Sequence, residues 1–241
     1  MNKKAKVGTV KVEVWGDFMC PFCYIAKRQF ETALAQFSQR DSVELVWKSF
    51  QLQDNALIEK PMNAIEFVAQ SKKIPLLLAR KALNGIAERA QSAGLHFDFT
   101  KTIVANTMDA HRLRHFAQTQ GKGRELEEAL YDGYFVSGIN LGDRSALVQL
   151  AVRHGLAAEP TRVALDSGAY GEFVQKGMAE ATQIGVKGVP YYLFNLTDEL
   201  VGQQSVEVYL QALELAYAKS VDELEHDELT GGFCGIDRDC A

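Results

Sequence analysis

The sequence VKVEVWGDFMCPFC, residues 10–23, joins an alternating segment to a closely spaced pair of cysteines. Apolar and polar residues alternate up to Trp15, which predicts a β-strand over residues 9–15. After a short turn, apolar residues recur at helical spacing, which predicts a helix from the cysteine pair to about Gln39. Cys20 and Cys23 therefore stand where a strand ends and a helix begins.

Further segments with strand character frame the rest of the chain. Val43 to Phe50 follows the first helix, so the chain opens in β-α-β order. Near the other end, residues 191–194 and 199–201 are separated by a turn-like segment and predict a β-hairpin. Ser205 is placed to cap a last helix that ends near Lys219. A β-α-β unit first and a β-β-α unit last is the order of a thioredoxin-type domain.

The stretch between these units has helical periodicity. From about Gln51 to Gly185 we expect no strand, and helices over residues 75–93, 102–119, 124–136, 143–154 and 170–184. The predicted fold is of the α/β class: a thioredoxin-like fold interrupted by a large all-helical insertion domain. We assign residues 8–51 and 185–220 to the thioredoxin-like domain and 52–184 to the insertion. Residues 221–241 form an acidic C-terminal tail, expected to be solvated and mobile.

The composition is that of an ordinary globular protein. With 241 residues, 47% of them apolar, the chain can bury a core without cross-links. The net charge of −5 gives no electrostatic reason to expect nucleic-acid binding. The N-terminal residues lead into a strand rather than an apolar run, and no apolar stretch is long enough for a transmembrane helix. We therefore expect no nucleic-acid partner, no membrane partner and a cytoplasmic location.

The four cysteines fall into two close pairs, Cys20 with Cys23 and Cys234 with Cys240. So few cysteines do not make a disulfide scaffold, and their pairing favours redox or metal chemistry. At a helix start, backbone amides and the helix dipole stabilise a thiolate, so Cys20 is the predicted nucleophile and Cys23 resolves the mixed disulfide. Half of a zinc knuckle is the alternative; because zinc needs two further ligands, we expect no metal and no resident cofactor.

Two short elements are expected to tune and complete this centre. Pro21 and Phe22 separate the cysteines and include no cation that would favour an extreme thiolate. The segment 188–191, Gly-Val-Pro-Tyr, stands directly before the predicted hairpin. A cis Val189–Pro190 bond would place the Val189 backbone beside the sulfurs, where an extended substrate can pair with it. A proline that only marks the edge of a strand is the alternative.

In combination, these motifs resemble one family. The motifs occur in the order typical of the FrnE-like branch of the DsbA family, within the thioredoxin superfamily: Asp17-x-x-Cys20-Pro21-Phe22-Cys23, Asn106-Thr107-x-x-Ala110-His111, Gly142-Asp143, Gly185-Val186-x-Gly188-Val189-Pro190 and Gly202-Gln203-Gln204. The resemblance covers nearly the whole chain. It implies a thioredoxin domain interrupted by a helical domain, with the active cysteines at their interface and a cis proline opposite them.

The resemblance also implies roles for single residues. Asn106 and His111, on one insertion helix, would face the cleft, and Asp17 would modulate the cysteines. Ordinary surface or cap-forming roles are the alternative for the first two, and a turn with Gly16 is the alternative for Asp17. The predicted catalytic residues are Cys20, Cys23 and Pro190, and the predicted substrate-binding residues are Asp17, Pro21, Phe22, Asn106, His111 and Val189.

The branch includes members with an additional C-terminal cysteine pair, and Cys234 and Cys240 resemble one. The resemblance therefore implies a tail that exchanges electrons with Cys20 and Cys23, against the alternative of an inert tail.

The predicted activity is that of a protein disulfide oxidoreductase acting on protein or small-thiol substrates, with glutathione open as a co-substrate. Kappa-class glutathione transferases and 2-hydroxychromene-2-carboxylate isomerases share the architecture but typically present a serine nucleophile, so Cys20 and Cys23 together favour redox exchange. A redox-regulated chaperone is a further alternative. A cytoplasmic location would favour reduction or isomerisation of disulfides over net oxidation. The sequence leaves the oligomeric state open.

Overall fold

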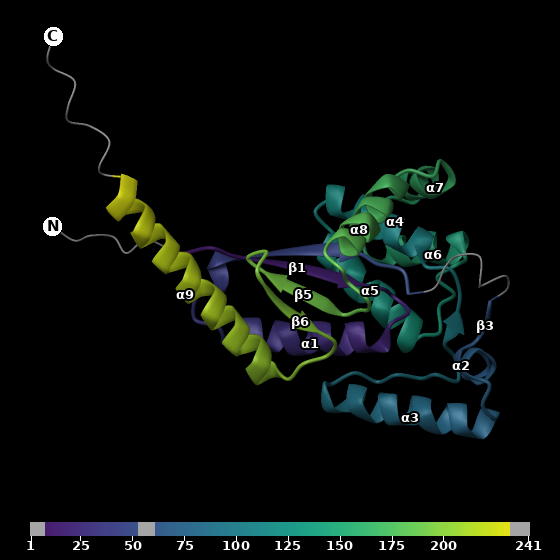
Figure 1. Ribbon diagram of the computed structural model, residues 1–241. Coiled ribbons are helices and arrows are strands. Elements are labelled where there is room, and N and C mark those ends of the chain that lie inside the picture. Colours follow the sequence, from purple (N-terminus) through teal and green to yellow (C-terminus); the bar gives the residue numbers. More distant parts are fainter. Residues whose placement is uncertain (1–7, 53–60, 232–241) are drawn as a thin grey trace, which may run out of the picture.

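The computed structural model describes residues 8–52 and 61–231, and over these residues it is built on a four-stranded sheet (Figure 1). The strand order is β2-β1-β5-β6. The first strand, β1 (Val10–Gly16), runs parallel to β2 (Val43–Ser49) and antiparallel to β5 (Tyr191–Phe194), which pairs in turn with β6 (Asp198–Val201). The predicted β-α-β and β-β-α units therefore meet at the pairing of β1 with β5.

The alternation along β1 decides which helices cover which face of the sheet. Its three buried valines, Val10, Val12 and Val14, pack with residues of α1 (Pro21–Gln36) and α9 (Val206–Gly231). Trp15 points to the opposite face and belongs to a separate cluster with residues around the end of α8 (Gly171–Gln183). The sheet is thus covered on both faces, which accounts for the nearly complete burial of its two central strands, β1 and β5.

Helix α8 approaches the sheet closely because Gly177 faces it. A Cβ at this position would lie 2.9 Å from the backbone oxygen of Ser49 in β2. The Gly177 carbonyl accepts a hydrogen bond of 2.9 Å from the Trp15 indole nitrogen. This single small residue lets the last insertion helix contact two strands.

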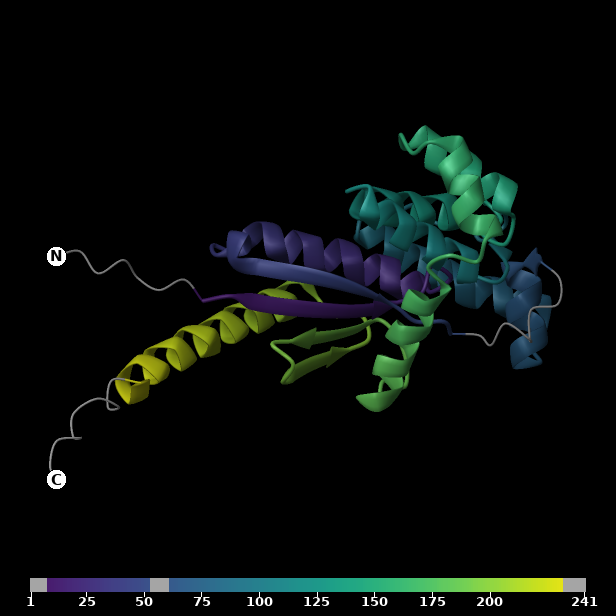
Figure 2. The same cartoon turned by 90° about the horizontal axis from the view of Figure 1, so that it is seen from above.

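The remaining helices gather around the end of the sheet where β1 ends, whereas the C-terminal end of α9 lies at the opposite end (Figures 1 and 2). They are α2 (Ala64–Lys72), α3 (Leu76–Ser92), α4 (Met108–Thr119), α5 (Gly123–Phe135), α6 (Arg144–Arg153) and α7 (Ala158–Asp166). A short 3₁₀ helix, η1 (Arg40–Ser42), precedes β2. The predicted α/β fold with a helical insertion is confirmed. Within the described residues, no helix is both long enough and apolar enough to span a membrane.

The prediction that the insertion contains no strand is wrong. The strands β3 (Met62–Asn63) and β4 (Ile103–Val104) form a small antiparallel sheet. Strands of two residues are too short to show alternation, and their partners lie far apart in the sequence. Helices α2 and α7 are also absent from the prediction, because nine residues are shorter than the window over which a helical period is recognised.

The helix predicted over residues 102–119 begins only at Met108. The preceding residues are extended in part, since β4 occupies Ile103–Val104, and Asn106 then forms a turn by accepting a hydrogen bond from the Met108 backbone. A local side-chain contact of this kind competes with the helix and fixes its start.

The last helix is longer than predicted. It continues beyond Lys219 to Gly231, because no glycine or proline interrupts residues 206–230 and glutamate and leucine are good helix formers. The predicted helix end near Lys219 is therefore wrong, and residues 221–231 are helical. Cys234 and Cys240 lie outside the described residues.

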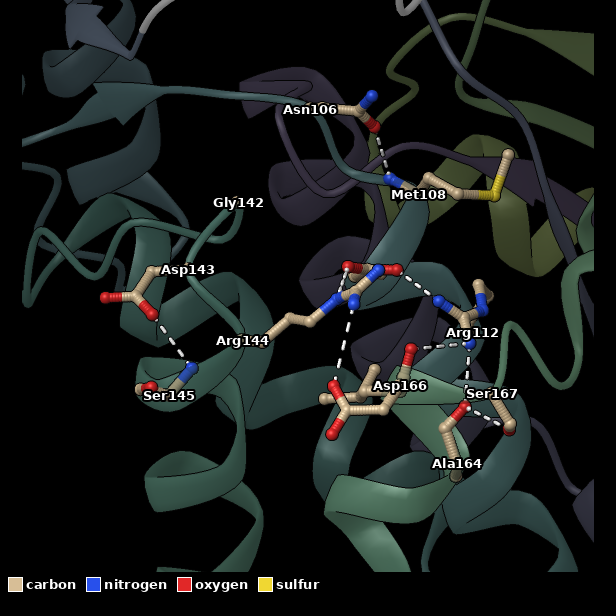
Figure 3. A network of polar contacts seen from close by, with 12 residues as sticks. Asn106, Met108, Arg112, Gly142, Asp143, Arg144, Ser145, Ala164, Asp166 and Ser167 are labelled. Carbon is tan, nitrogen blue, oxygen red and sulfur yellow. Dashed lines mark hydrogen bonds and ion pairs between the residues drawn. The ribbon is translucent and has the colours of Figure 1, made fainter.

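Buried Arg112 ties α4 to the end of α7 (Figure 3). Its guanidinium donates hydrogen bonds to the backbone oxygens of Ala164 (2.7 Å), Leu165 (3.0 Å) and Ala169 (2.7 Å). It also pairs with Asp109 on its own helix. The last carbonyls of a helix lack partners within that helix, so one side chain here satisfies several acceptors at once.

We predict that Arg112→Met lowers the free energy of unfolding by about 3 kcal/mol, because it leaves buried carbonyls without their donor and removes one of the two cations that pair with Asp109. The matched control is Arg144→Met. Arg144 also pairs with Asp109, at 2.7 Å, but its side chain is 50% exposed, so the expected loss is below about 1 kcal/mol. Urea unfolding followed by circular dichroism measures both values, and equal losses would contradict the assignment.

Candidate functional site

Cys20 and Cys23 lie at the start of α1. Cys20 is the N-cap residue and Pro21 takes the first helical position, where its lack of an N–H costs nothing. The Cys20 N–H donates to the Asp17 backbone oxygen at 3.0 Å, and the Cys23 N–H donates to the Cys20 oxygen at 3.1 Å. Both residues are free thiols and both are buried, with exposed fractions of 3% and 4%. Pro21 and Phe22 are half-buried between them.

The loop before β5 lies against the first cysteine. The Val189–Pro190 peptide bond is cis, as the sequence predicts. The Cys20 Sγ lies 3.6 Å from the Val189 backbone oxygen, a contact between residues 169 positions apart. Val189 is half-buried and Pro190 is buried. The structure thus brings together the three predicted catalytic residues, Cys20, Cys23 and Pro190. The start of α1 places the two cysteines, and the Val189 carbonyl next to Pro190 contacts the Cys20 sulfur.

The two thiols differ in their surroundings. Burial raises the pKa of Cys23 well above its usual value, and the hydrogen bond and charge of Cys20 raise it further. Cys23 is therefore a protonated thiol near neutral pH. It lies one turn into the helix, behind Cys20, as expected of a residue that acts second.

Asp17 is completely buried beneath the cysteine turn. Its carboxylate accepts a hydrogen bond of 2.8 Å from the Leu52 backbone N–H and one of 3.4 Å from the Met19 N–H. One of its oxygens lies 3.3 Å from the His111 Nε2. Asp17 therefore connects the cysteine turn, the segment after β2 and helix α4. It presents no surface to a substrate.

His111 is also completely buried, so it does not line an open cleft as expected. Its ring packs against Phe18, with centroids 4.9 Å apart, and stacks on Trp47 at 5.4 Å. Among the described residues, its Nδ1 has no hydrogen-bond partner. His111 and Asp17 form a buried pair that positions the cysteine turn.

Asn106 does not share a helix with His111, because it precedes α4 (Figure 3). Its side-chain oxygen accepts from the Met108 N–H at 2.8 Å and lies 3.5 Å from the Gln51 side-chain nitrogen. These contacts are those of the cap-forming alternative. Its predicted role in substrate binding stays a prediction.

Several residues beside the cysteines were not predicted from the sequence. Tyr131 stacks on Tyr24 with centroids 5.0 Å apart, and Trp47 lies under the Arg114 guanidinium at 4.8 Å. Arg114 forms a buried ion pair of 3.3 Å with Glu127. One feature of the sequence points to these residues: Glu127 stands at an apolar position of α5, four residues before Tyr131. A charged residue in an apolar stripe needs a buried partner, which here is Arg114.

No group of three or more histidine, cysteine, aspartate or glutamate side chains within residues 8–52 and 61–231 is arranged to hold a metal ion. The predicted redox pair Cys234 and Cys240 falls outside these ranges and stays a prediction.

Several known proteins are similar to this chain in sequence or in fold. A crystal structure described as a probable DsbA oxidoreductase from Streptomyces coelicolor is 32% identical, covers 87% of this chain and 90% of its own, and has a TM-score of 0.81. The uncharacterized protein YwbO of Bacillus subtilis (strain 168) is 24% identical over 85% of this chain and 96% of its own. A 2-hydroxychromene-2-carboxylate isomerase, 17% identical over 88% of this chain and 98% of its own, shares the fold with a TM-score of 0.63.

The family model of the DSBA-like thioredoxin domain matches residues 11–214, which include both parts of the sheet and the whole insertion. The predicted resemblance to the DsbA family is thereby confirmed, while membership of the FrnE-like branch stays a prediction. By this match and by its 32%-identical relative, the chain belongs to the DsbA-like family of thiol–disulfide oxidoreductases.

Proposed function

We propose that this protein exchanges disulfides with its substrates through Cys20 as the nucleophile and Cys23 as the resolving thiol. One observation carries the proposal: the Cys20 Sγ lies at a helix N-terminus and 3.6 Å from the Val189 carbonyl, with a second thiol one turn behind it. A helix N-terminus stabilises negative charge on sulfur, and an exposed backbone edge offers a partner to an extended peptide.

The reaction begins with attack of the Cys20 thiolate on one sulfur of a substrate disulfide. The substrate S–S bond breaks, a mixed disulfide with Cys20 forms, and the departing thiolate takes a proton from solvent. Cys23, as a thiolate, then attacks the Cys20 sulfur and releases the second half of the substrate. Two electrons pass from the Cys20–Cys23 dithiol to the substrate, and the reverse sequence oxidises a substrate dithiol.

The substrate class follows from the groups around Cys20. The neighbouring Val189 offers backbone atoms rather than a charged side chain, and Met19 and Phe22 add half-buried apolar surface. Such a surface fits an extended segment that carries a disulfide or thiol, in a protein or in glutathione, without a requirement for one side chain. Two adjacent thiols favour this exchange over the isomerisation of a 2-hydroxychromene-2-carboxylate, which needs no second thiol.

We predict that reduced protein alkylates at Cys20 at least about tenfold faster than at Cys23 at pH 7, because burial raises the pKa of Cys23 and leaves little thiolate there. Timed iodoacetamide labelling with peptide mass spectrometry measures both rates in one sample. Equal rates would remove the basis for the assignment of nucleophile and resolving thiol.

We also predict that Cys23→Ser retains a stable mixed disulfide on Cys20 after reaction with oxidised glutathione, because no second thiol resolves it. The matched variant Cys20→Ser forms little or no adduct at Cys23. Both variants are made with Cys234→Ser and Cys240→Ser, so that only one thiol is left in each. Intact-protein mass spectrometry reports the adduct, and comparable adducts on the two variants would contradict the proposed order of attack.

A further inference from the structure

A small cavity of about 70 Å³ lies beside Cys23, and Pro190 also forms part of its wall. Polar atoms converge at its wall: a Cβ built on Gly16 would lie 3.2 Å from the Tyr131 hydroxyl, 3.5 Å from the Trp47 indole nitrogen and 3.7 Å from the Cys23 Sγ. Glu127 also lines this cavity. About two water molecules fit in such a volume, and although most of the wall is apolar, these polar groups offer hydrogen-bond partners to water.

Cys23 needs a proton acceptor before it can attack. Its thiol is buried and protonated, so direct loss of the proton to bulk water is slow and unfavourable. The Asp17 carboxylate is already engaged by Leu52 and His111. An acceptor for Cys23 must therefore be reached through the cavity.

Glu127 is the carboxylate best placed to accept this proton. The cavity wall includes a second acid, Glu31, but its side chain is 42% exposed and pairs with Lys27 at 2.6 Å. Glu127 is 7% exposed and pairs with Arg114 at the longer distance of 3.3 Å, which leaves its carboxylate less tightly held. Lys27 is a cation and cannot accept a proton.

The groups that face Glu127 come from several elements. They are Cys23, Lys27 and Glu31 of α1, Arg114 of α4, Arg124 and Tyr131 of α5, and Tyr192 of β5. Burial raises the pKa of Glu127, although the charges of Arg114 and Lys27 oppose this effect. A raised carboxyl pKa reduces the free energy needed to move a proton from a thiol to that carboxylate.

We propose that Glu127 accepts the proton of Cys23 through water held in this cavity by the Tyr131 hydroxyl and the Trp47 indole. As the proton leaves, the Cys23 S–H bond breaks and its electron pair forms the S–S bond to Cys20. The Cys20–substrate S–S bond breaks and the substrate leaves as a thiolate, while Glu127 becomes a neutral acid that later returns its proton to solvent. This inference rests on the proposed function, because it concerns only the second of its two steps.

The test separates the two steps with the chromogenic disulfide 5,5′-dithiobis(2-nitrobenzoate). Attack by Cys20 releases one coloured thiolate and resolution by Cys23 releases the second, so stopped-flow absorbance gives a rate for each. The full chain is used, with Cys234→Ser and Cys240→Ser to limit the count to Cys20 and Cys23. Glu127→Gln is expected to slow the second release by about 10- to 100-fold at pH 7 and to leave the first within about twofold.

Three variants accompany Glu127→Gln. Glu127→Asp, which keeps the carboxylate, should recover part of the lost rate. Glu128→Gln, which removes the neighbouring charge that pairs with Lys27 and Arg28, should keep both releases near their original rates. Tyr131→Phe removes only one hydroxyl from the cavity wall and should slow the second release alone, which gives an independent test if Glu127→Gln does not fold.

The pH profile distinguishes a proton acceptor from a structural role. In the unmodified chain, the second release should fall as pH falls through the raised pKa of Glu127 and level off above it. In Glu127→Gln it should rise about tenfold per pH unit, because hydroxide replaces the lost acceptor, so the two rates converge at high pH.

An unchanged second release in both Glu127→Gln and Tyr131→Phe would overturn the inference, and so would an equal slowing of both releases at every pH. Absence of any first release from the unmodified chain would instead overturn the proposed function, since that release depends on Cys20 alone.

Discussion

The buried carboxylate of Asp17 holds the two parts of this protein together at the cysteines. It accepts the Leu52 N–H just beyond β2 and lies 3.3 Å from His111 of α4, while its backbone oxygen accepts the Cys20 N–H. A fully buried carboxylate is costly unless its oxygens have partners, so these segments keep a fixed relation to one another. The start of α1, and with it the direction of the Cys20 sulfur, is thereby set by contacts that begin in the insertion.

The sequence predicts the sheet well because each strand and its covering helix carry a clear period. Along β1 the valines alternate with polar residues, and the hairpin of β5 and β6 is bounded by turn residues. The small sheet of β3 and β4 gives no such signal, since two residues cannot define a period. The start of α4 and the extension of α9 depended on a side-chain turn at Asn106 and on the absence of breakers before Gly231, and helical periodicity is a poor guide to both.

The chemistry of the site was predictable where it depends on spacing, and not where it depends on packing. Cys20, Cys23 and the cis Val189–Pro190 bond follow from motifs whose geometry is local or shared by a fold. The buried ion pair of Arg114 with Glu127 joins α4 to α5, and nothing in either helix alone shows that their side chains meet beside Cys23. The full burial of His111 is likewise a result of tertiary packing.

Helix α9 also determines where the described part of the chain ends. It passes the start of β1, where Gly8 packs against Ser220, and then continues away from the cysteines (Figures 1 and 2). From Ser220 to Gly231 it advances about 16 Å, and β1 spans about 20 Å in the opposite direction. The described end of α9, at Gly231, therefore lies at the opposite end of the sheet from Cys20 and Cys23.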